Sequence, residues 1–126
     1  MKKILITLMV LFVVATTTAQ EQFSRVFNTV VVYDVETKTE TEETDLVTFT
    51  FNVGGQNTIK IEAGEFLMTL HAVDVVETLT DSNGLEFQYG KYQVVGDFEN
   101  TWEVFVYSNV VVIGLRGKIG IGFYTR

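Results

Sequence analysis

The only histidine of the sequence, His71, is the residue best suited to acid–base catalysis, and Asp74 follows it three positions later. Such a pair suggests a small hydrolase or a metal-binding protein in which His71 acts with nearby carboxylates. A catalytic triad would also need a nucleophile, but Ser24, Ser82 and Ser108 all lie outside any Gly-x-Ser-x-Gly motif. The simpler interpretation is that His71 is structural, and the sequence predicts no catalytic residue and no cofactor.

Acidic residues are concentrated between positions 34 and 45, and carboxylates are the oxygen ligands that Ca²⁺ prefers. In the spacing of an EF-hand loop, Lys38 would replace an oxygen ligand and Thr39 would replace the glycine of the sharp turn. We therefore predict no metal site here and interpret the run as the solvated end of a β-hairpin. The acidic residues of the run are Asp34, Glu36, Glu40, Glu42, Glu43 and Asp45.

Four aromatic residues with polar tips are the candidates for ligand binding: Tyr89, Tyr92, Trp102 and Tyr107. Their rings favour half-exposed positions, where they can stack against a sugar or line an apolar pocket. The alternative is that they belong to the ordinary core and surface of the domain.

The first 19 residues have the layout of a secretory signal peptide. Lys2 and Lys3 precede an apolar run from Ile4 to Ala15, and small residues stand at Thr17 and Ala19. The apolar run of about twelve residues is too short to span a bilayer as a helix. We predict a leader helix over residues 1–19, cleavage after Ala19, and export to the periplasm or the extracellular space of a bacterium.

Charge and composition limit the classes of partner and site that the mature chain can have. Removal of the leader takes away two of nine basic residues and none of the 16 acidic ones, so the net charge falls from −7 to −9. A surface of that sign repels phosphate backbones, which argues against nucleic acid as a partner. Because the sequence has no cysteine, disulfides and thiolate metal sites are excluded.

Alternating apolar and polar residues predict an all-β domain over residues 20–126, with no membrane span. Val47, Phe49 and Phe51 alternate with polar residues, and turn-forming residues such as Gly54 and Gly55 separate the runs. No helical period intervenes, so we predict a small antiparallel β-barrel or β-sandwich of about seven to nine strands. The predicted strands lie near 25–37, 45–53, 58–62, 65–79, 85–95, 102–108, 110–115 and 118–125.

Two segments depart from simple alternation. Asp74 falls in the apolar row of the strand near 65–79, which predicts a bulge or a change of face near Val73. The segment from Val110 to Ile113 is apolar on both faces, as expected for a strand that is covered on both sides or forms an interface. The sequence also lacks proline, which often protects sheet edges, so self-association through the hairpin from Val110 to Tyr124 is an alternative.

Taken together, these features predict an exported, non-catalytic binding or interaction module. Its partner would be a small apolar or carbohydrate ligand, or a protein that pairs with a sheet edge. The alternatives are the hydrolase or metal-binding protein based on His71, and a structural subunit that forms homo-oligomers through the C-terminal hairpin.

The predicted leader can be tested by expressing the full chain in a bacterium and measuring the mass of the exported product by mass spectrometry. The product should begin at Gln20, because signal peptidase recognises the small residues Thr17 and Ala19. Ala19→Leu should leave the precursor uncleaved, whereas Thr16→Leu should be cleaved normally. An exported product that retained Met1 would contradict the prediction.

Overall fold

The computed structural model describes residues 21–126, so the predicted leader helix and its cleavage site lie outside the described residues. A single 3₁₀ turn, Val53–Gly55, is the helical element of this part of the chain. The strands are β1 (Phe23–Asp34), β2 (Thr39–Phe51), β3 (Thr58–Ala63), β4 (Phe66–Ala72), β5 (Glu77–Thr80), β6 (Glu86–Val94), β7 (Trp102–Val106), β8 (Val110–Leu115) and β9 (Ile119–Tyr124).

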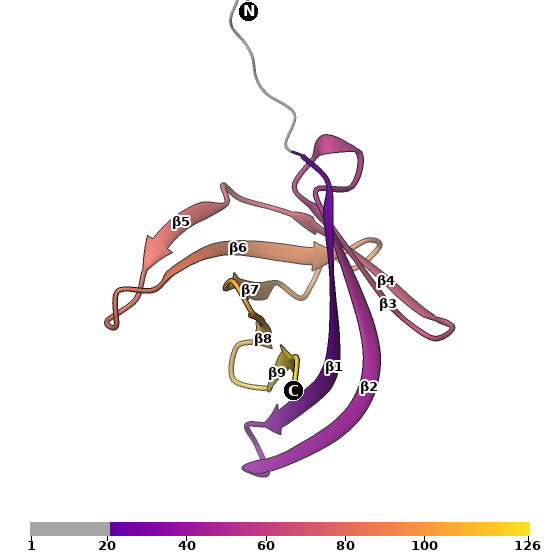
Figure 1. The fold of residues 1–126 in the computed structure, drawn as a ribbon, viewed down its shortest axis with the longest axis vertical. Helices are drawn as coiled ribbons and strands as arrows, with labels where there is room; N and C mark the ends of the chain where they lie inside the picture. Colours follow the sequence, from indigo (N-terminus) through magenta and orange to yellow (C-terminus); the bar gives the residue numbers. More distant parts are fainter. Residues whose placement is uncertain (1–20) are drawn as a thin grey trace, which may run out of the picture.

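Eight of the strands close into an antiparallel barrel (Figure 1). Neighbouring strands are joined mostly by short hairpins, and β1 pairs with β9, so the first and last strands of the chain lie side by side in the sheet. The circle is completed where β4 pairs with β6, through Leu70 opposite Val94 and Ala72 opposite Tyr92. The predicted all-β fold is therefore confirmed, and of the two predicted architectures the barrel is the one formed.

The predicted strand near 65–79 is two strands, β4 and β5, separated by an irregular segment. Ala72 lies opposite Tyr92 and Glu77 lies opposite Tyr89. An advance of five residues from β4 to β5 therefore matches an advance of only three residues along β6. The extra residues include Asp74, which is exposed at the position where simple alternation would have buried it. The irregularity near Val73 was predicted, but its effect was not, because it leaves β5 paired only with the outer part of β6 (Figure 1).

The acidic run is mostly strand and only partly turn, which corrects the prediction that strand structure begins near residue 45. Hydrogen bonding to β1 extends β2 back to Thr39, with Val30 opposite Glu43 and Tyr33 opposite Glu40. β3 pairs with only the last part of β2, from Thr48 to Phe51, so the acidic part of β2 has one neighbouring strand among the described residues. Charged side chains are a common protection for such an edge.

Phenylalanine rings fill the centre of the barrel. Phe49 is fully buried and meets Phe27 and Phe123 edge to face, with ring centroids 5.6 and 4.7 Å apart. Phe51 stacks beside Phe49 at 5.7 Å. Leu70 on β4, which is also fully buried, belongs to the same core and ties the closing strand to it.

Arg25 fastens the first part of β1 to the turn between β7 and β8. The pairing of β1 with β9 begins at Thr29, so the residues before it have β2 as their neighbouring strand. The guanidinium of Arg25 donates hydrogen bonds to the carbonyl oxygens of Tyr107 (2.5 Å) and Ser108 (3.1 Å), and lies 5.5 Å from the ring of Phe23. These contacts bridge the barrel where backbone pairing is missing.

Residues 21–126 include no helix with the length and hydropathy needed to cross a bilayer.

Two leucines of β4 test how much the closing strand depends on the core. Leu70→Ala should lower the free energy of unfolding by about 2–5 kcal/mol, because it leaves a cavity among buried side chains. Leu67→Ala is the matched control, since Leu67 is 60% exposed on the opposite face and its loss should cost no more than about 0.5 kcal/mol. Urea unfolding followed by tryptophan fluorescence measures both, and equal losses would contradict this placement of β4.

Candidate functional site

One end of the barrel is hollow, and its floor is apolar. The hollow has a volume of about 290 Å³ and lies at the end that carries the β1–β2, β3–β4 and β8–β9 turns. Four buried side chains from β2, β3, β8 and β9 form its floor, and they are at the same time the upper layer of the barrel core. The floor residues are Val47, Ile61, Ile113 and Phe123.

The walls of this hollow, which we name the barrel cup, are also apolar. Half-buried side chains form the walls, namely Val30, Val32, Ala63, Met68 and Ile121. At the rim stand Phe66, which is 56% exposed, and Asp45, which is the single ionisable residue of the lining.

A register shift between β1 and β2 sets which side chains point into the barrel cup. Phe27 lies opposite Val47, whereas Thr29 lies opposite Thr44, so two residues of β2 face one residue of β1. Before the bulge, the odd-numbered Phe27 points into the barrel. Beyond it, the even-numbered Val30 does so, opposite Phe123 on β9. The bulge also places Asp45 at the mouth of the cup.

The four predicted aromatic residues do not form one surface. Tyr92 and Trp102 lie opposite each other on β6 and β7 and face the barrel interior, where Tyr92 is 6% exposed. The ring of Tyr92 takes up the space above Gly90, where an added Cβ would come within 2.7 Å of it. Tyr89 and Tyr107 belong to the outer wall, so an intervening sheet separates the two pairs.

Tyr89 and Tyr107 instead join two phenylalanines on the outside of β6 and β7. Phe87 stacks on Tyr107 with ring centroids 5.0 Å apart, and Tyr89 lies 5.1 Å from Phe105. All four rings are half-buried. The members of this outer aromatic group lie on a convex wall, whereas the barrel cup is concave.

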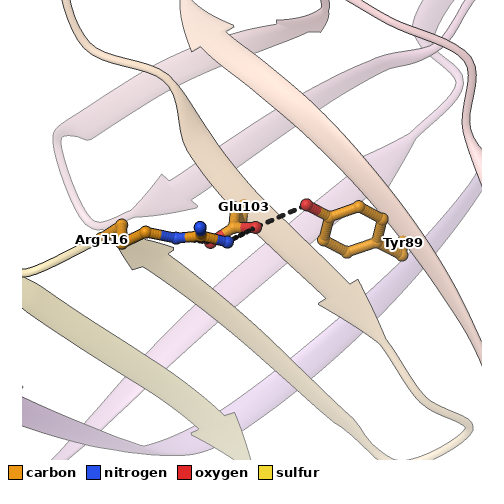
Figure 2. Close-up of polar contacts among 3 residues, drawn as sticks. All are labelled: Tyr89, Glu103 and Arg116. Atoms are coloured by element: carbon orange, nitrogen blue, oxygen red, sulfur yellow. Dashed lines mark hydrogen bonds and ion pairs between the residues drawn. The ribbon is translucent and has the colours of Figure 1, made fainter.

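A polar triad adjoins the outer aromatic group (Figure 2). Glu103 on β7 receives a hydrogen bond from the hydroxyl of Tyr89 at 2.5 Å and forms a two-point ion pair with Arg116, at 2.8 and 3.2 Å. These bonds, first the one from Tyr89, hold the pKa of Glu103 below its ordinary value. The same bond to an anion raises the pKa of Tyr89. The triad ties β6 and β7 to the β8–β9 turn.

His71 lies on the outer wall, between Thr58 on β3 and Gln93 on β6. Within residues 21–126, no ion pair or hydrogen bond joins it to a carboxylate, and Asp74 instead accepts a bond from its neighbour Val75. The same residues contain no group of three or more histidine or acidic side chains arranged to hold a metal ion.

The barrel cup was missed in the sequence because its lining comes from six strands. Alternation identified the apolar row of β3, but Val110 to Ile113 is apolar on both faces and indicated no inward row for β8. The wall contributed by Val30 and Val32 depends on the β1–β2 bulge, and the register of that pairing cannot be read from either strand alone.

No family model, curated protein or solved structure matches this chain. Functional inference therefore rests on the geometry of the barrel.

The triad predicts a stability difference that depends on pH. Glu103→Gln should lower the free energy of unfolding at pH 7 by about 0.2–1 kcal/mol, the usual range for an exposed ion pair. Because the folded-state pKa of Glu103 is lowered, its contribution is complete above the ordinary pKa of about 4.3 and is lost as the pH falls through the folded value. The difference between the two proteins should therefore shrink below pH 4.

Urea unfolding at pH 7 and at pH 2.5 measures this difference. Glu77→Gln, which removes an exposed carboxylate from β5, is the control and should show little change at either pH. A Glu103→Gln deficit that stayed the same at both pH values would show that packing, and not the charge of Glu103, is responsible.

Proposed function

We propose that the protein is an exported, non-catalytic binding protein that holds a small apolar ligand in the barrel cup. The observation that supports this most is the composition of the cup, whose floor and walls are apolar side chains from six strands. Small-molecule sites are typically concave and mostly apolar, and eight-stranded barrels are just wide enough to hold one small ligand at the mouth.

The size of the barrel cup limits the ligand. A volume of about 290 Å³ corresponds to about ten groups of the size of a water molecule. The cup is open to solvent at the rim, so a longer ligand can extend outward past Phe66.

The lining favours an apolar ligand over a carbohydrate. Sugar hydroxyls need hydrogen-bond partners when they leave water, and Asp45 is the one polar side chain that the barrel cup offers. Stacking on an aromatic platform is the other usual support for a sugar, and the four predicted aromatic residues lie on opposite sides of the sheet.

Export is the second part of the proposal and rests on residues 1–19. A chain without cysteine suits either side of a membrane, so the argument for export depends on the apolar run and the small residues Thr17 and Ala19. A small binding protein that meets its ligand outside the cytoplasm is consistent with such a leader.

The alternative functions have less support. A hydrolase would need carboxylates near His71, which stands on the outer wall apart from the barrel cup. Self-association through the C-terminal hairpin would have to use the outer wall, because β8 lies between β7 and β9, and β9 lies between β8 and β1.

Filling the barrel cup tests the proposal. Ala63→Phe places a ring among the wall residues and should raise the dissociation constant for the neutral dye N-phenyl-1-naphthylamine at least tenfold, as expected for losing contact with roughly two CH₂ groups. Fluorescence titration measures the change, since the dye brightens in an apolar site.

The matched control is Val26→Phe, which adds the same ring at a position of β1 that is 52% exposed on the outer wall. It should bind the dye as the unaltered protein does. Absence of dye binding to the unaltered protein, or equal binding by both variants, would refute the assignment of the barrel cup as the site.

A further inference from the structure

The charge around the barrel cup is strongly biased toward acid. Asp45 lines the rim, and Glu43 lies opposite Val30, on the face of β2 that continues the wall of the cup. Asp34 lies opposite Ile119 on the corresponding face of β1. Other turns and loops at this end of the barrel add further carboxylates, from Glu36, Glu65, Asp97 and Glu99.

The carboxylates that face the cup are not neutralised by the protein. Within residues 21–126, no ion pair involves Asp34, Glu43 or Asp45, whereas Glu42 on the other face of β2 pairs with Arg126 at 2.6 Å. The basic residues of this end are Lys38 and Lys118 in the turns, and Arg116, which is engaged with Glu103. None of the three lines the cup.

We propose that the ligand of the barrel cup is a cationic amphiphile, an apolar chain or ring that carries an ammonium group. This inference rests on the proposed function and specifies its ligand class. The apolar part lies on the floor of the cup, and the ammonium group stays at the rim beside Asp45. Opposite charges a few ångströms apart attract, and they do so more strongly where apolar walls lower the effective dielectric constant.

The same geometry disfavours anionic amphiphiles. A carboxylate or sulfate head group at the rim would lie beside Asp45 and Glu43 with no lysine or arginine in the lining. Repulsion between like charges would oppose the gain from burying the chain. A neutral amphiphile should fall between the two charged classes.

Three amphiphiles with the same ten-carbon chain test the ligand class: decyltrimethylammonium, decyl maltoside and decyl sulfate, all below their micelle-forming concentrations. We expect displacement of N-phenyl-1-naphthylamine in that order of affinity, with the cation binding about three- to tenfold more tightly than the neutral compound at low salt. The preference should weaken in 0.5 M NaCl, where charges are screened within a few ångströms.

Asp45→Asn should abolish most of the preference for the cation and leave the affinity for decyl maltoside unchanged. Asp45 is exposed, so the variant should remain folded, which a thermal melt followed by circular dichroism checks. Glu77→Gln removes one carboxylate from β5, outside the cup lining, and should keep the preference.

The possible results separate the two proposals. If none of the amphiphiles displaces the dye, and the dye itself does not bind, the proposed function fails. If all three bind with equal affinity, if decyl sulfate binds most tightly, or if Asp45→Asn keeps the full preference, the cationic ligand class is overturned while the barrel cup remains a binding site.

Discussion

The interior of a closed eight-stranded barrel is narrow and must be filled with side chains, and the rest of this structure depends on how that filling is done. Phe49 provides the centre, because its ring is fully buried and packs edge to face against Phe27 and Phe123. Toward the end that carries the β1–β2 turn, the inward residues become smaller, with Val30, Val32 and Ala63 in place of phenylalanine. The side chains therefore do not fill the barrel as far as its mouth. The stable core and the barrel cup are thus two parts of one interior, and Phe123 belongs to both.

Much of the fold could be predicted from the sequence because local patterns determine it. Alternation in β2 and β7 gave the strands and their inward rows, and Gly84 and Gly117 adopt the positive φ values of 83° and 77° expected in the turns. Closure of the barrel was not predictable, because the β4–β6 pairing skips β5 and joins strands that do not follow each other in the chain. The separation of Tyr89 from Tyr92 could have been predicted from the sequence, since an odd spacing within one strand places two side chains on opposite faces. The rim position of Asp45 could not have been predicted, since it depends on the β1–β2 bulge.

The two faces of β7 show how one strand serves two purposes. Val104 and Val106 face the interior, while Glu103 and Phe105 face outward and join the polar triad and the outer aromatic group. In a chain without cysteine, such double use spreads stabilising contacts over both sides of the sheet. Acidic residues, in contrast, are gathered on the β1–β2 hairpin, the part of the barrel with the fewest neighbouring strands. Charge is therefore concentrated where it disturbs packing least.

The pairing of β1 with β9 also determines when the molecule can fold. Thr29 lies opposite Tyr124, so this ladder, which the closed barrel needs, joins residues 95 positions apart along the chain. The entropic cost of forming such a distant contact slows folding, and the contact cannot form before the last strand is available. A polypeptide that emerges from a ribosome or a translocation channel with its N-terminus first must therefore remain without its native closure until nearly the whole chain has been released. Until then, β1 lacks the partner strand that β9 provides.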